Sequence, residues 1–507
     1  MKDNRDSKLI GKVRTRVAPS PTGDPHVGTA FQALLDFVFA HRYEGTFILR
    51  IEDTDRKRFV DESEDVIFEA LEWLNLNPDE SPKVGGEYGP YRQSERLNTY
   101  KKYAKQLVAE GKAYYCFCSS ERLEKMRQDQ QAQKKPPMYD RNCRNLTQEE
   151  VDRRLASGEK AVIRMKIPDN KEIIVHDLLR GEVKFDSNIV DDQVILKSDG
   201  YPTYHLAVVV DDHLMEITHM KRGEEWLSSA PKHVLLYEYF GWQMPLMIHT
   251  PTLRNPDRSK LSKRKGNTSL WYYREQGYIK EALLNFLALL VWKHPITNNE
   301  IFTKEEMMES FEWEQMNITG PIFDIVKLQW LNGMWIRKKS LEDLLIDIKD
   351  WATWVSVVGK EKQEEAKKVL SWIEKDPDFF QKALALTHER LKIISEIPEL
   401  LSFYYVDKLT YDREDLLQKH EAQDIARILG EVKNRLEKLE SWTQETWEAT
   451  IRKCADDFSF KHKDLFMCMR SAITARKATP PLFEVMNVLG KEESFKRVDD
   501  AINFLNN

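Results

Sequence analysis

The chain has 507 residues, enough for three or four domains, and its hydrophobic content of 41% lets each domain bury a core, which excludes general disorder. Its 77 basic and 83 acidic side chains leave a formal charge of −6 at pH 7, so any nucleic-acid site must be a local patch. The longest apolar run, Ala282–Trp292, is too short to cross a bilayer, which takes roughly 20 residues.

The amino terminus and the cysteines predict a cytoplasmic protein. Residues 1–12 are polar, carry charges of both signs and lack the apolar core of a secretion signal. Of the five cysteines, three lie between Cys116 and Cys143, and the others are Cys454 and Cys468. This distribution fits reduced thiols or a metal site better than a disulfide framework.

The first hundred residues predict a strand, a loop, a helix and a second strand. β-compatible residues at 12–18 precede a loop at 19–25, whose three prolines and one glycine forbid helix. Apolar residues then recur at helical spacing over 28–45, and 46–51 is a second strand. A βαβ unit of this kind predicts a parallel sheet. A second amphipathic helix follows at 61–76.

The pattern changes twice further along the chain. Residues 101–199 mix short strands with polar helices, as an insertion would. The apolar run Tyr204–Val210, bounded by Pro202 and by Asp211 and Asp212, predicts a buried parallel strand at which the sheet resumes. Beyond about residue 275, helical patterns continue to the carboxyl terminus and predict one or two helical domains, in which the charged run 360–368 is a solvated helix face.

The loop after the first strand is the first candidate for chemistry, because open α/β sheets bind ligands at the carboxyl ends of their strands. Neither a Gly-x-x-x-x-Gly-Lys-Ser/Thr loop nor a Gly-x-Gly-x-x-Gly fingerprint occurs. Instead, His26 stands at the expected helix start, and Gly28 allows close approach of the backbone. A histidine at this position is also compatible with a simple capping role.

A second candidate is the stretch Arg254–Lys265, in which six of twelve residues are basic. It could be a solvated basic loop. It could equally be a lid that carries ammonium groups to the phosphates of a nucleotide, since nucleotidyl transfer depends on positioning and charge stabilisation.

These two stretches resemble the signatures of a known enzyme class. Pro25–Thr29 resembles the HIGH signature and Lys260–Arg264 the KMSKS signature of class I aminoacyl-tRNA synthetases. Longer strings resemble bacterial glutamyl-tRNA synthetases, and the resemblance covers essentially the whole chain. These strings are Arg16–Gly23, Arg50–Asp55, Ser198–His205 and Arg222–Trp226.

The resemblance implies an α/β fold: a Rossmann-like class I synthetase catalytic domain split by an α+β insertion and followed by all-α anticodon-binding domains. The expected boundaries are 1–100 and 196–250 for the two halves of the catalytic domain, 101–195 for the insertion, 251–340 for a stem-contact region with the KMSKS-like loop, and 341–410 and 411–507 for the two parts of the anticodon region.

It also implies an activity, the attachment of L-glutamate to tRNA(Glu) through a glutamyl-adenylate, with release of AMP and diphosphate. His26, Lys260 and Lys263 would be catalytic, because they would meet the phosphates of ATP and the developing diphosphate. Mg²⁺ would accompany ATP. The residues expected at ATP are His26, Gly28, Glu225, Trp226, Lys260 and Lys263.

Glutamate requires a cationic partner for its side-chain carboxylate, and a guanidinium can bind it in a forked manner. By resemblance Arg16 is that group, Glu52 faces the ammonium, and Tyr204 forms a wall. Arg16 and Glu52 could instead be an ordinary ion pair. Val208 stands where many members carry an asparagine, and valine cannot hydrogen-bond. The full set expected at glutamate is Arg16, Ala18, Ser20, Glu52, Tyr204 and Arg222.

The cysteine cluster matches the zinc-binding insertion of some family members, in which thiolates hold a tetrahedral metal. Cys116, Cys118 and Cys143 supply three ligands. Asn145, two residues after the last cysteine, is a poor ligand, and Tyr139 is the alternative fourth. The other interpretation is three reduced cysteines without Zn²⁺.

The expected partners are tRNA(Glu), ATP and L-glutamate, with no membrane, for a monomer. Arg390 falls where some members read the third anticodon base, although it could be a helix-surface arginine. Whether tRNA(Gln) is also charged stays open. Glutaminyl-tRNA synthetases have a β-barrel anticodon region, which the helical pattern after residue 340 does not match. A regulatory tRNA-binding protein would have lost the signatures.

Overall fold

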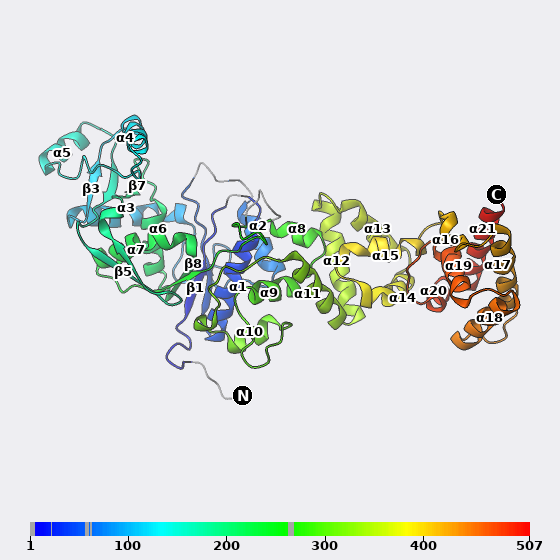
Figure 1. Cartoon of the computed structure of the whole chain (residues 1–507). Coiled ribbons are helices and arrows are strands. Elements are labelled where there is room, and N and C mark those ends of the chain that lie inside the picture. The colour runs from blue at the N-terminus through cyan, green and yellow to red at the C-terminus, as the bar shows by residue number, and fades with distance from the viewer. Residues whose placement is uncertain (1–5, 22, 56–59, 61–62, 262–267) are drawn as a thin grey trace. The chain divides into compact units, whose positions relative to one another are not determined.

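The computed structural model describes residues 6–21, 23–55, 60, 63–261 and 268–507. The chain divides into two compact units (Figure 1). The first comprises Met1–Tyr272 and Lys280–Ile325, and the second comprises Tyr273–Ile279 and Val326–Asn507.

The first unit begins with the expected βαβ arrangement. β1 (Arg14–Val17) and β2 (Thr46–Leu49) pair in parallel, and α1 (Val27–Arg42) connects them. The chain returns to β1 at Gly45, where a Cβ atom would lie 2.1 Å from the carbonyl oxygen of Val13, so only glycine fits. The two strands and the helix are confirmed, each slightly shorter than predicted. The second predicted helix is α2 (Ser63–Trp73).

A second group of strands forms a four-stranded sheet. β8 (His219–Gly223) pairs in parallel with β9 (Leu246–Thr250), which pairs in parallel with β5 (Glu172–Asp177), and β6 (Gly181–Asp186) is antiparallel to β5. β1 lies beside β8, since the Thr218 amide donates to the Arg14 carbonyl at 3.0 Å. The carboxyl ends of β1 and β8 therefore meet at one edge.

The region between these strands is the mixed segment that the sequence predicts. It contains an antiparallel sheet of β3 (Ala113–Cys116), β4 (Val162–Met165) and β7 (Val194–Leu196). Its helices are α3 (Leu97–Ala109), α4 (Ser120–Ala132) and α5 (Gln148–Ala156).

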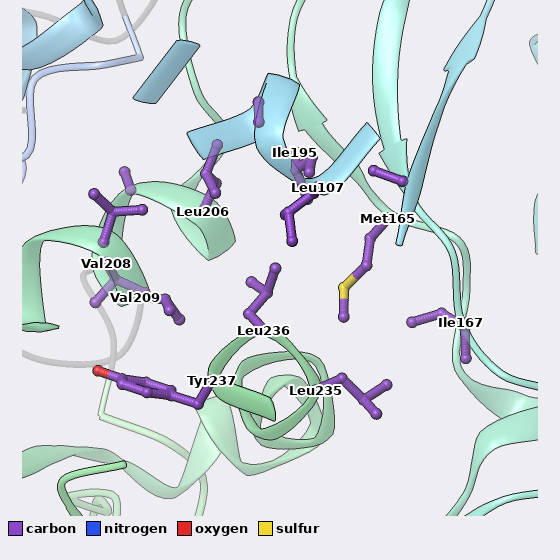
Figure 2. Packing of buried hydrophobic residues seen from close by; sticks show 14 of the residues in the cluster. Leu107, Met165, Ile167, Ile195, Leu206, Val208, Val209, Leu235, Leu236 and Tyr237 are labelled. Atoms are coloured by element: carbon purple, nitrogen blue, oxygen red, sulfur yellow. The ribbon is translucent and has the colours of Figure 1, made fainter. Parts of the chain in front are cut away.

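The prediction of a buried strand over Tyr204–Val210 is wrong, because this run forms the start of α6 (Tyr204–Leu214). Every residue from Leu206 to Asp212 is buried. A helix covered on all sides needs no polar stripe, so a continuous apolar run does not distinguish it from a buried strand. Figure 2 shows Val208 and Val209 in the hydrophobic cluster that α6 forms with α7 (Ala230–Phe240) and α3. The sheet resumes at β8 instead.

In the second unit the described elements are helices, as predicted. The charged run 360–368 opens α13 and is largely exposed, with Ala366 as its buried position. The helices from α8 to the carboxyl terminus are α8 (Leu270–Glu275), α9 (Lys280–Leu289), α10 (Lys304–Ser310), α11 (Ile325–Lys338), α12 (Leu341–Val358), α13 (Gln363–Lys375), α14 (Pro377–Thr387), α15 (Ile397–Leu401), α16 (Arg413–Leu417), α17 (Ala422–Glu437), α18 (Gln444–Asp457), α19 (His462–Thr474), α20 (Leu482–Leu489) and α21 (Lys491–Asn506). Within the described residues, none of the helices has the length and apolar character needed to span a membrane.

Candidate active site

The edge where β1 and β8 end carries an arginine from each strand. Arg16 is the third residue of β1, and its Nη1 donates to the Lys221 carbonyl of β8 at 2.8 Å. Arg222 is the fourth residue of β8, and its Nη1 donates to the Tyr204 hydroxyl at 3.5 Å. Both guanidinium groups are buried. β1 and β8 thus bring together two arginines that lie far apart in the sequence, and Tyr204 of α6 contacts the second of them.

Arg16 is bound by Asp212 of α6 in a forked ion pair. Its Nε and Nη2 donate to the two carboxylate oxygens of Asp212, each at 3.1 Å. Asp212 also accepts from Arg50 Nη1 at 2.7 Å, and Arg50 Nη2 donates to Glu52 Oε1 at 3.0 Å. Arg16 and Glu52 are therefore not directly paired; Asp212 and Arg50 connect them in one network.

Burial and charge act against each other in this network. Burial alone would raise the pKa of Asp212, but Arg16 and Arg50 outweigh it and hold that pKa below its usual value. At Glu52, burial prevails over the opposing charges of Arg50 and Arg16, and its pKa is raised. Burial also raises the pKa of the Tyr204 hydroxyl, on which the charges of Arg222, Glu52 and Arg16 all act. The charges of both arginines and of Glu52 therefore reach the same buried hydroxyl.

Arg222 has a different environment. Its Nη1 donates to His233 Nδ1 at 2.7 Å, and its Nη2 lies 2.6 Å from the sulfur of Met220. Its Nε is buried without a hydrogen-bond partner. Among the described residues, no carboxylate lies within ion-pair distance of this guanidinium. The ring of Tyr204 packs against Trp226 with centroids 4.4 Å apart, which closes the wall beside Arg222.

His26 caps the amino terminus of α1. Its Nδ1 accepts from the Gly28 amide at 2.8 Å. A Cβ atom on residue 28 would lie 2.9 Å from that nitrogen, so glycine allows the ring to take this position. A cavity of about 100 Å³ lies beside His26, and its lining includes Ser20, Asp24 and Thr29. Of the other predicted residues of this loop, Ala18 is half-buried and Ser20 is exposed.

Lys260 lies close to the helical turn Glu224–Ser229. Its ammonium group is 3.7 Å from Glu225 Oε1, and the Thr252 hydroxyl donates to Glu225 Oε2 at 3.2 Å. Trp226, in the same turn, is 39% exposed. Lys263, the second predicted lysine, lies outside the described residues.

The three cysteines of the insertion form a second cluster, with all sulfur atoms within 4.8 Å of one another. The Tyr139 hydroxyl lies 3.3 Å from both Cys116 Sγ and Cys118 Sγ. Hydrogen bonding from the Cys116 thiol lowers the pKa of Cys143 to about 4. Thiolate character and tetrahedral numbers of ligands are what Zn²⁺ requires, so the donor set fits this metal. Asn145 is exposed.

Arg390 belongs to the second unit, where it ends the turn His388–Arg390 with an exposed side chain. Burial and the charge of Arg390 lower the pKa of Arg470 on α19. The positive charges of Arg390 and Arg470 therefore act on each other within this unit.

Sequence reasoning missed three residues of the site: Arg50, Asp212 and His233. Arg50 lies in the string Arg50–Asp55 but was given no role, and Asp212 was used only as the boundary of the apolar run Tyr204–Val210. The doubled acid at Asp211 and Asp212 was the available signal, since both are fully buried and must be paired. Nothing in the sequence around His233 indicates its contact with Arg222.

Comparison with known proteins defines the class. The family model of the catalytic domain of class I tRNA synthetases, E and Q type, matches residues 12–330, and a model of an anticodon-binding domain matches residues 363–502. The chain therefore belongs to the class I tRNA synthetases of the E and Q type.

Its similar relatives within that family are glutamate–tRNA ligases. One from Fusobacterium nucleatum is 44% identical over 507 residues, with 97% of both chains covered, and one from Acidothermus cellulolyticus is 47% identical over 492 residues, covering 96% of this chain and 95% of the relative. The crystal structure of a glutamate tRNA ligase from Elizabethkingia meningosepticum in complex with its amino acid is 35% identical, covers 97% of this chain and 100% of that one, and has a TM-score of 0.85.

Proposed function

We propose that this chain is a glutamate–tRNA ligase, which activates L-glutamate with ATP and transfers it from a glutamyl-adenylate to tRNA(Glu), releasing AMP and diphosphate, for protein synthesis. One observation carries the assignment of the amino acid. Two buried arginines and one buried glutamate all act by their charge on the Tyr204 hydroxyl, and a glutamate molecule offers two carboxylates and one ammonium group as their complements.

Arg16 binds the side-chain carboxylate of the substrate. A guanidinium has five N–H donors, of which Arg16 directs three at Asp212 and the Lys221 carbonyl. One N–H on each terminal nitrogen is left, and this pair suits a forked bond to a carboxylate. Asp212 holds the fork still, so the arginine is oriented before the substrate arrives.

The remaining groups orient the rest of the amino acid. Arg50 occupies Glu52 Oε1, which leaves Oε2 for the substrate ammonium. Tyr204 and Arg222 form the opposite wall, and Ala18 and Ser20 contact the substrate from the loop after β1. Val208 contributes packing alone, because it is fully buried in the hydrophobic cluster.

ATP binds between the α1 terminus and the KMSKS-like loop. The amino end of α1 favours phosphate, and His26 and Gly28 stand there. Lys260 and Lys263 stabilise the developing diphosphate, while Glu225 and Trp226 lie on the adenosine side. Lys260, the first residue of the KMSKS-like string, lies 3.7 Å from Glu225 Oε1. Mg²⁺ would accompany ATP and offset the negative charge of its phosphates.

tRNA(Glu) is the second substrate, and the helical second unit binds its anticodon through exposed Arg390 and its neighbours. Because charged tRNA is used in translation, the chain works in the cytoplasm, and we expect a monomer. Cys116, Cys118 and Cys143, with Tyr139 as the fourth ligand, would hold Zn²⁺ in the insertion, where it would fix β3 to the following loops.

The test is transfer of radiolabelled glutamate and, separately, glutamine to tRNA(Glu) and tRNA(Gln) with ATP and Mg²⁺. A Lys263→Ala variant serves as the control for chemistry at the phosphates. Transfer of glutamate to tRNA(Glu), lost in the variant, is the expected result. Absence of transfer of either amino acid, with tRNA still bound, would instead identify a regulatory tRNA-binding protein.

A further inference from the structure

The inference concerns what holds Arg222 in place, and it rests on the proposed function. The described acceptors around this guanidinium are an imidazole, a phenol and a thioether: His233 Nδ1, Tyr204 Oη and Met220 Sδ. None of the three carries a negative charge in its ordinary state. Asp177 ends β5, which β9 separates from β8. Its carboxylate accepts from the ring and the backbone amide of His249, at 2.6 and 2.9 Å.

The contact with Arg222 fixes the protons of two histidines. A guanidinium only donates, so His233 Nδ1 must accept, and a neutral His233 carries its proton on Nε2. That nitrogen lies 3.0 Å from Nδ1 of His205, which must therefore accept in turn and keep its own proton on Nε2. The hydrogen bonds thus run in one direction, from Arg222 of β8 to His233 of α7 and on to His205 of α6.

The surroundings keep both rings neutral. His233 is fully buried, and burial, followed by the charge of Arg222, holds its pKa well below the usual value. Burial and the charges of Lys232 and Arg222 lower the pKa of His205 to about 3. A charged ring at either position would turn an acceptor into a donor and break the chain of hydrogen bonds.

A neutral acceptor does something that a carboxylate cannot. It orients the guanidinium while leaving its positive charge uncompensated inside a buried site, where charge interactions are strong. Glutamate carries one more negative charge than glutamine, so its side-chain carboxylate, bound at Arg16, is also attracted through space to the charge of Arg222, whereas the carboxamide of glutamine gains little. At Arg16, by contrast, Asp212 orients the group and cancels its charge.

We propose that His233, supported by His205, is a positioning residue that keeps Arg222 oriented and electrically uncompensated, and thereby favours glutamate over glutamine in the amino-acid site.

The test uses three substitutions of one residue in the full chain. His233→Asn places an amide oxygen where Nδ1 stands, and His233→Asp places a carboxylate oxygen at the same point, so this pair differs only in charge. His233→Leu removes the acceptor at similar volume. Steady-state aminoacylation of tRNA gives kcat and KM for glutamate, glutamine and ATP.

The expected result for His233→Leu is a glutamate KM raised about tenfold to hundredfold, the effect of losing a hydrogen bond to a charged group, with kcat and the ATP KM nearly unchanged. His233→Asn should restore most of this loss. His233→Asp should restore the orientation of Arg222 yet keep a raised glutamate KM, and its preference for glutamate over glutamine should fall by about tenfold or more.

Equal glutamate KM and equal preference in the Asn and Asp variants would overturn the proposal, because the charge on Arg222 would then not matter. So would an unaffected His233→Leu protein. If His233→Leu does not fold, the Asn and Asp pair decides alone. A parent protein that transfers no glutamate would refute the proposed function itself, an outcome that the variants cannot imitate.

Discussion

The two arginines of the site show two ways to hold a buried cation. Arg16, at the end of β1, shares the carboxylate of Asp212 with Arg50 and belongs to an ion network that reaches Glu52. Arg222, at the end of β8, is held by a neutral histidine. The first arrangement fixes geometry with most of the charge cancelled, and the second keeps the charge available. A site that must bind a doubly acidic amino acid needs both properties, and the fold supplies each from a different strand.

The largest effect should come from breaking the network on the β1 side with Asp212→Asn. This isosteric change leaves Arg16 and Arg50 without their shared counter-ion, so we expect a loss of about 3–5 kcal/mol in the free energy of unfolding. The glutamate KM should also rise steeply, because Arg16 loses its fixed orientation. Denaturant unfolding and aminoacylation kinetics measure the two quantities.

Asp211→Asn is the matched control for that change. Asp211 is equally buried on the same helix, but its hydrogen bonds come from Arg96, Tyr100 and Gln93, and its contact with Arg50 is a longer one of 3.8 Å. We expect this variant to lose stability while its glutamate KM stays within about twofold of the parent, because Asp212 still holds Arg16 and Arg50 in place. A glutamate KM unchanged by Asp212→Asn would contradict the role given to the network.

A smaller and unequal effect is expected when each arginine becomes lysine. Lysine keeps the charge but presents no planar fork. Arg16→Lys must give up either the fork to Asp212 or the one to the substrate, so we expect a rise of about a hundredfold in glutamate KM together with lower stability. Arg222→Lys loses one contact to His233, and about tenfold is expected without a comparable loss of stability.

The order of these two effects tests the comparison. Measured side by side by aminoacylation and thermal unfolding, Arg16→Lys should be the less stable and the weaker binder. If Arg222→Lys proved the less stable protein, Arg222 rather than Arg16 would be the arginine that stabilises the fold. The roles given to the two arginines would then have to be exchanged.

A third change, Tyr100→Phe, removes a hydrogen bond from Asp211, which precedes Asp212 on α6. The Tyr100 hydroxyl lies 2.8 Å from Asp211 Oδ2, and Tyr100→Phe removes this bond from a fully buried carboxylate. We expect a loss of about 1–2 kcal/mol in the free energy of unfolding, with unchanged glutamate KM. Tyr103→Phe on the same helix is the control, because no hydrogen bond of its hydroxyl occurs among the described residues; equal losses in the two variants would contradict the prediction.

The contrast between the two regions also marks what could be predicted from the sequence. Arg16 and Arg222 stand in short strings that resemble those of glutamyl-tRNA synthetases, and this resemblance nominated them. Their partners were not accessible in this way: Asp212 lies 196 residues from Arg16, and its contact depends on how α6 packs against the sheet. His233 is only 11 residues from Arg222, but the strand and helix that bring them together leave no local pattern.

The wrong strand at Tyr204–Val210 has the same origin. Valines favour strands when a surface is half-buried, but α6 is buried along its length, and burial removes the periodicity that would reveal a helix. The misassigned element α6 carries Tyr204, His205 and Asp212. With a strand expected there, the contacts of these residues with Arg16 and His233 could not be predicted, although the motifs that resemble the synthetase signatures were recognised.

The smallest predicted effect concerns pH and should separate the two regions. Asp212 has a lowered pKa and stays charged in mild acid. His205 and His233 have lowered pKa values in the folded protein, whereas a histidine in the unfolded chain has a pKa near 6.5. Because the pKa of folded His205 is lowered to about 3, the unfolded state binds the extra proton as pH falls, and stability is lost with it. Asp36, whose pKa burial raises to about 6, acts with the opposite sign and is the same in parent and variant.

His205→Asn removes this titration and retains an oxygen that can accept from His233. Between pH 7 and pH 6 the parent should lose about 0.7 kcal/mol more than the variant in its free energy of unfolding by urea, since the unfolded histidine becomes largely protonated over that interval. An equal loss in both proteins would mean that His205 is charged in the folded state. Its Nδ1 could then not accept from His233, and the chain of hydrogen bonds that leaves Arg222 uncompensated would have to end at His233.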